Sequence, residues 1–132
     1  MIGCFLDAFP PSRPTRMDGI PGLLRFLLEG IEYAERPHNQ SVYRYVYGRN
    51  LIQEIASKAL RLSRTASGAD LELLQRMQSL LRGEMRRALQ WKAFLKPHEV
   101  QLHDILLDQC ARDTVDLFDT QMRWLLLVHG CK

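Results

Sequence analysis

The chain has 132 residues and a formal net charge of +3; 46% of its residues are hydrophobic and 25% are charged. This length suits one domain with a working core, and this balance excludes an intrinsically disordered chain. Residue 2 is isoleucine, the first nine residues lack a basic segment, and no apolar run approaches the ~20 residues that cross a bilayer. N-myristoylation, a secretory leader and a membrane span are therefore not expected.

The N-terminal residues 1–17 contain three prolines, which predicts a flexible, extended arm. The remainder, residues 18–132, is expected to form a single helical-bundle domain. The sequence leaves open whether translation starts at Met1 or at Met17.

The first predicted helix runs from Pro21 to about Glu35. Asp18 is a plausible cap, proline suits the first helical turn, and Pro37 ends the pattern. Gly30 falls on the apolar side of this helix, where the missing side chain would permit close approach of a neighbouring helix.

The segment Ser41–Tyr47 is ambiguous, because its alternation of residue types has the period of a strand. A lone strand would leave its backbone amides unpaired, so we favour one helix over Ser41–Ser63. On that helix Tyr43 and Tyr47 stack one turn apart on the outer side. They would contact nucleic-acid bases or a protein partner there, or else cover the rim of the core.

The clearest amphipathic helix spans Asp70–Lys96, with Asp70 or Ser67 as its cap. Its apolar half consists of Leu73, Leu74, Met77, Leu80, Leu81, Met85, Ala88, Leu89, Trp91 and Leu95. Gly83 lies on the outer face, whereas Glu84 falls within the apolar half and requires a polar partner there.

The last predicted helix begins at Pro97 and persists to about Val128. One face is expected to be apolar: Leu106, Leu107, Cys110, Ala111, Val115, Leu117, Phe118, Met122 and Leu125. A polar line follows the middle of that face: His103, Cys110, Thr114 and Gln121. The opposite face holds Asp108, Arg112, Asp113, Asp116, Asp119 and Arg123, with Asp104 at its border. The run Trp124–Val128 is apolar all round, which predicts that these turns are buried by this chain or by another subunit.

No catalytic, metal or cofactor pattern emerges. His98 and His103 are five residues apart and point about 140° apart on a helix, so they do not form the metal pair that a spacing of four gives. Cys110 lies about 10 Å along the helix from His103, too far for proton transfer. Cys4, Cys110 and Cys131 have no paired spacing, which predicts reduced thiols and a soluble, intracellular protein of the cytoplasm or nucleus.

Charge is segregated along the chain. Residues 37–96 carry +7, residues 18–36 carry −2 and residues 97–132 carry −3; arginine outnumbers lysine 14 to 4. An arginine-rich face favours phosphate or carboxylate recognition, although a GC-rich genome yields the same bias. The acidic face of the last helix would lie beside the basic faces of the middle two, or those basic faces would point outward to an acidic partner.

These patterns predict an all-α protein, an antiparallel bundle of about four helices with a Pro-rich arm. Our leading hypothesis is a non-enzymatic adaptor or regulatory module that binds a protein partner and self-associates as a homo-oligomer, without a cofactor or small-molecule substrate. Its candidate interface comprises Tyr43, Tyr47, His103, Cys110, Thr114, Gln121, Trp124, Leu126 and Leu127. The alternative is largely sequence-independent nucleic-acid binding by Arg44, Arg49, Lys58, Arg61, Arg76, Arg82, Arg86 and Arg87.

Overall fold

The computed structural model describes residues 19–130, so the arm predicted for residues 1–17 lies outside the described part of the chain. Four main helices form this part: α2 (Gly19–Ala34), α3 (Ser41–Ser63), α4 (Leu71–Lys92) and α5 (Leu102–Leu125). Three short turns accompany them: the 3-10 turns η1 (Gly68–Asp70) and η2 (Pro97–Glu99), and the π-helical turn η3 (Leu126–Gly130). The all-α prediction is confirmed, and residues 19–130 contain no strand.

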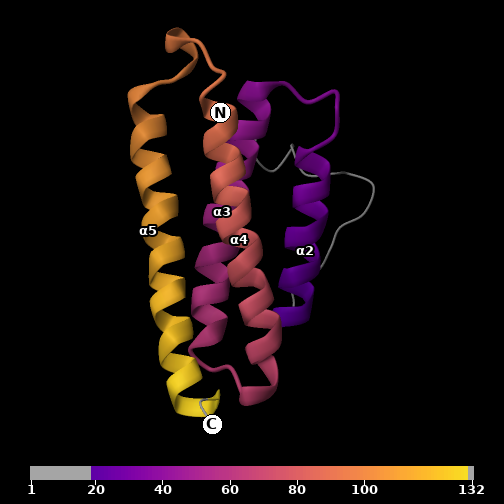
Figure 1. Ribbon diagram of the computed structural model, residues 1–132, viewed down its shortest axis with the longest axis vertical. Coiled ribbons are helices and arrows are strands. Elements are labelled where there is room, and N and C mark those ends of the chain that lie inside the picture. Colours follow the sequence, from indigo (N-terminus) through magenta and orange to yellow (C-terminus); the bar gives the residue numbers. More distant parts are fainter. Residues whose placement is uncertain (1–18, 131–132) are drawn as a thin grey trace.

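Successive helices run in opposite directions, with α2 and α5 on opposite sides of the pair formed by α3 and α4 (Figure 1). Helix α3 is central, since it packs against α2, α4 and α5. Among the long helices α5 packs mainly against α3 and α4, so much of its circumference faces outward. No helix among the described residues is long and apolar enough to cross a membrane.

The segment Ser41–Tyr47 forms the first turns of α3, which confirms the helix and excludes the strand. Helical spacing places Leu51, Ile55 and Ala59 on one face, and all three are fully buried. Gly30 lies against Leu51: a β-carbon added to that glycine would lie 2.7 Å from Leu51 Cδ2. The glycine therefore allows the close packing of α2 on α3 that its place on the apolar face predicted.

Local hydrogen bonds fix where α4 and α5 begin. At η1 the backbone N–H of Ser67 donates to Asp70 Oδ2 at 3.2 Å, which forms a capping box for that turn; Asp70 then precedes α4 as predicted, but its side chain makes no capping hydrogen bond to α4. The predicted start of the last helix at Pro97 is wrong, because that proline opens the separate turn η2. Helix α5 begins five residues later, where the backbone N–H of Gln101 donates to Asp104 Oδ2 at 2.9 Å.

Candidate functional site

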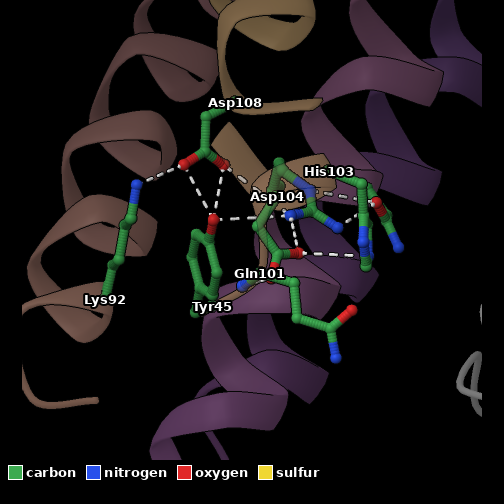
Figure 2. Close-up of polar contacts among 8 residues, drawn as sticks. Tyr45, Lys92, Gln101, His103, Asp104 and Asp108 are labelled. Atoms are coloured by element: carbon green, nitrogen blue, oxygen red, sulfur yellow. Dashed lines mark hydrogen bonds and ion pairs between the residues drawn. The ribbon is translucent and has the colours of Figure 1, made fainter. Parts of the chain in front are cut away.

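A buried polar cluster joins α3, α4 and α5 near the start of α5 (Figure 2). Its members, which we call the aspartate cluster, are Tyr45, Arg49, Lys92, Asp104 and Asp108. The Tyr45 hydroxyl donates to both carboxylate oxygens of Asp108, at 2.7 and 2.8 Å, and Lys92 Nζ donates to the same carboxylate at 2.8 Å. Arg49 donates to Asp104 at 2.8 Å and lies 3.7 Å from Asp108.

The environment of the aspartate cluster keeps its charges paired. Burial and the hydrogen bond to Asp108 raise the pKa of Tyr45, so this hydroxyl stays a donor at neutral pH. Burial alone would raise the pKa of Asp104, but the backbone N–H of Gln101 and the Arg49 guanidinium lower it below its usual value. Every charged group of the cluster has an opposite partner, so the cluster anchors α5 in position and offers no open site for a substrate.

A second anchor holds the C-terminal half of α5. Asp119 is buried and accepts hydrogen bonds from Arg82 Nε at 3.0 Å, Arg82 Nη2 at 2.6 Å and Gln78 Nε2 at 2.8 Å. Asp108 and Asp119 were predicted to lie on the face opposite the apolar one, with two alternatives for what that face meets; both side chains are buried. The alternative holds for both and for Asp104: these carboxylates lie against the basic side chains of the middle helices.

Internal contacts occupy most of the predicted basic face. Arg49 is only 4% exposed and belongs to the aspartate cluster, so it cannot form part of an outward surface. Arg82 binds Asp119. Arg87 forms ion pairs with Glu35 and Glu84.

Two further members of that face also have partners. Arg44 donates to the backbone oxygens of Asn39 and Arg36, at 3.0 Å each, and its guanidinium lies 4.4 Å from the centre of the Trp91 ring. Lys58 lies 3.2 Å from Glu54. The three remaining arginines, Arg61, Arg76 and Arg86, are exposed and have no ion pair within residues 19–130.

The tyrosines lie inward. Tyr43 and Tyr47 stack with ring centres 5.5 Å apart, and Tyr33 of α2 packs against both. Tyr47 is 1% exposed and Tyr43 is half-buried, so the predicted outer position of Tyr47 is wrong. Tyr47 is buried because α3 is the central helix. Helices α2 and α4 cover the side of α3 that would face solvent in a helix with one buried face. Tyr47 therefore belongs to the core, and the half-buried Tyr33 and Tyr43 pack against it.

Glu84 is buried beside this tyrosine group. Its polar partner, required by its place on the apolar half of α4, is Arg87 at 3.3 Å. That distance joins Arg87 Nη1 to Glu84 Oε1, an ion pair without the alignment of a hydrogen bond, and burial raises the pKa of Glu84 to about 7. Protonation of this carboxyl near neutral pH is therefore a property of the folded chain.

The outward face of α5 and η3 carries a row of large apolar side chains. We call it the α5 outer face: Leu102 (75% exposed), Leu106 (64%), Leu117 (58%), Trp124 (61%), Leu127 (68%) and Val128 (57%). The prediction that Leu106, Leu107 and Leu117 are buried is wrong, since the buried face of α5 is centred on Ala111, Val115 and Met122.

The predicted interface residues of α5 fall on or beside the α5 outer face. His103 and Cys110 are exposed, and Leu126 and Gln121 are half-buried. Thr114 is half-buried at the edge, where its hydroxyl donates to Gln53 Oε1 at 3.1 Å and to its own helix. The polar line therefore does not run through the core as predicted.

One signal for this face was present in the sequence. His103, Cys110, Leu117 and Trp124 recur every seven residues, and Leu106 and Leu127 lie three residues beyond members of that series. Such spacing places side chains on one seam of a helix and is typical of helix–helix contacts between chains. Apolar residues on the inner side of the same helix obscure this seam in the sequence.

Residues 19–130 give little support for a metal site or for a deep ligand pocket. No group of three or more His, Cys, Asp and Glu side chains is arranged to hold a metal ion there. An open groove of about 470 Å³ lies where α3 begins and α4 ends, lined by Arg44, Trp91 and Phe94 among others, with Arg87 and Glu35 also at its edge. A scan of protein-family models and searches of curated proteins and of solved structures found no match to this chain. The α5 outer face is therefore the candidate site with the clearest physical rationale.

Proposed function

We propose that this protein is a non-enzymatic interaction module that binds another protein chain along the α5 outer face. The observation that supports the proposal is the row of six large apolar side chains, each more than half exposed, along one side of one helix. Single exposed leucines are normal on protein surfaces, but contiguous apolar patches are characteristic of interaction sites.

The orientation of α5 strengthens this argument. Helix α5 turns three carboxylates inward, at Asp104, Asp108 and Asp119, while it leaves leucines and a tryptophan outward. Covering one such side chain is worth roughly 1.5–3 kcal/mol relative to leaving it in water. A helix that exposes several large apolar residues on one side gains most when a partner covers them, as in the docking of an amphipathic helix.

The nucleic-acid alternative has weaker support. Of the eight basic residues it invoked, five are engaged within the fold, and the exposed ones that remain are Arg61, Arg76 and Arg86. Affinity for a phosphate backbone grows with the number of phosphates contacted, so three separate arginines would give weak, strongly salt-dependent binding.

Site-specific photo-crosslinking tests the proposal. The photoreactive residue benzoylphenylalanine is placed at Leu106 or Trp124, and as matched controls at Arg76 or Arg86 on α4, in cells that make the protein. We expect protein adducts, either of this chain with itself or with another protein, at the two α5 positions and not at the two α4 positions. Adducts confined to α4, or absent everywhere, would refute the assignment of the α5 outer face.

A titration of labelled duplex RNA and DNA at two salt concentrations tests the alternative. Tight binding at low salt that Arg76→Glu with Arg86→Glu abolishes, and that Leu106→Glu with Trp124→Glu leaves unchanged, would transfer the function to nucleic acid. The proposal expects no binding that depends on those arginines.

A further inference from the structure

We infer that the occupant of the α5 outer face is a second copy of this chain, paired antiparallel through α5 about a two-fold axis at the level of Val115. This inference rests on the proposed function and specifies its partner. The apolar residues gather at the two ends of the face, with Leu102 and Leu106 at one end and Trp124 and Val128 at the other.

The middle of the face is more polar. Between the two apolar ends lie Cys110, Asp113 and Thr120, all exposed, with Leu117 among them. An antiparallel pair brings the N-terminal apolar end of one copy against the C-terminal apolar end of the other, twice by symmetry. In the middle of the face Cys110 then meets the partner's Thr120, and Asp113 meets the partner's Leu117.

The level of the axis follows from matching these ends. With the axis at residue 115, Leu106 faces the partner's Trp124, and Leu102 faces the partner's Val128. In this register each apolar end covers the apolar end of the other copy, so that Leu106 with Trp124 and Leu102 with Val128 are shielded from water together. A parallel pair would instead oppose Trp124 to Trp124 and Asp113 to Asp113, and two carboxylates at such a contact repel each other.

A second copy is favoured because the described residues offer one extensive apolar surface. Eight of their ten exposed large hydrophobic side chains belong to α5 and η3; the others are Leu28 and Phe94. A two-fold interface uses the same patch on both subunits, so one self-complementary face suffices. Pairing over 24 residues of α5 covers a strip roughly 36 Å long and about 10 Å wide. Such a strip amounts to about 360 Å² per subunit, which is less than half of a standard interface, so we expect a weak dimer with a dissociation constant of micromolar order or higher.

Disulfide trapping tests the geometry. In this register Cys110 faces the partner's Thr120, whereas the two copies of Cys110 lie about 15 Å apart along the axis. The full chain with Cys4→Ser and Cys131→Ser keeps one thiol and serves as the control; adding Thr120→Cys gives the test variant. Thr120 is exposed, so this substitution leaves the fold intact, and circular dichroism verifies it.

Under mild oxidation the test variant should form a covalent dimer whose tryptic map links the peptide containing Cys110 to the peptide containing residue 120. The one-thiol control should remain largely uncrosslinked, since a disulfide needs Cα atoms within about 7 Å. A dominant Cys110–Cys110 link would show a parallel pair and overturn the inference. So would a monomer by sedimentation at several hundred micromolar, or a dimer whose association Leu106→Glu with Trp124→Glu does not weaken.

The two tests fail separately. Photo-crosslinking at Leu106 and Trp124 could yield adducts only with other proteins, while the Thr120→Cys variant forms no linked dimer. That result would support the α5 outer face as an interaction surface and would refute the second copy as its occupant. If the α5 positions yield no adduct with any protein, the proposed function itself falls.

Discussion

Replacing Glu84 by glutamine should stabilise the protein in a pH-dependent way. Burial raises the pKa of this carboxyl from its ordinary 4.5 to about 7. Between those two pH values the folded chain holds a proton that the unfolded chain has released, so stability falls as pH rises through that window. Glutamine has the same shape and no charge to bury, so the variant escapes this loss.

The size of the effect follows from the pKa difference. A shift of about 2.5 pH units corresponds to roughly 3 kcal/mol once the carboxyl is fully ionised in both states. The advantage of Glu84→Gln over the parent should therefore be near zero at pH 4, grow between pH 4.5 and 7, and level off at up to about 3 kcal/mol above pH 7.5. The ion pair with Arg87, whose side chain is partly exposed, offsets part of this cost, so the figure is an upper bound.

Urea unfolding followed by circular dichroism at pH 4, 5.5, 7 and 8 measures the difference directly. Glu32→Gln is the matched control, because Glu32 is exposed on α2 and its replacement changes net charge by the same amount. An advantage for Glu84→Gln that is equal at all four pH values, or largest at pH 4, would refute the account of a buried carboxylate. An equal pH trend in Glu32→Gln would assign the effect to net charge instead.

Two further predictions address the packing and the anchors. Gly30→Ala should be less stable than Gly83→Ala by about 1–3 kcal/mol in the same unfolding assay, since both gain helix propensity but only the first forces a methyl group against Leu51; equal effects would contradict the close contact. Arg49→Met should destabilise the fold by roughly 3–5 kcal/mol because it removes the arginine that pairs with the buried Asp104 and leaves Asp108 with Lys92 alone. Arg61→Met, at an exposed site, should change stability by less than about 0.5 kcal/mol, and similar losses in both variants would argue against a buried ion pair.

Helix positions were predictable where several local signals agreed. For Ser41–Ser63 the strand-like alternation of its first seven residues conflicted with the helical spacing of the remainder, and the lack of a partner strand decided correctly in favour of α3. The close packing at Gly30 was also predictable, because a glycine on the apolar face of a helix implies a close neighbour. Neither inference required knowledge of which helix packs where.

The predictions that proved wrong concern residues whose burial depends on how the helices pack together. Tyr47 falls outside the apolar stripe of α3 when the helix is considered alone, yet it is buried because a central helix has neighbours on several sides. Arg49 looked like part of a basic surface because arginine is usually exposed, and its partners, Asp104 and Asp108, are more than fifty residues away in the chain. No local pattern encodes such a pairing.

Helix α5 shows why the candidate site was predicted only in part and why it carries the functional argument. Apolar residues occur on both of its sides, so hydrophobic periodicity alone cannot say which side faces the core. Its rotation is set by three aspartates that find Arg49, Lys92 and Arg82 on the inner side, where an unpaired carboxylate would be far more costly than an exposed leucine. The ion pairs therefore hold the aspartate side of the helix against the core. The leucines and Trp124 on the other side remain exposed, and we propose that a second chain covers them.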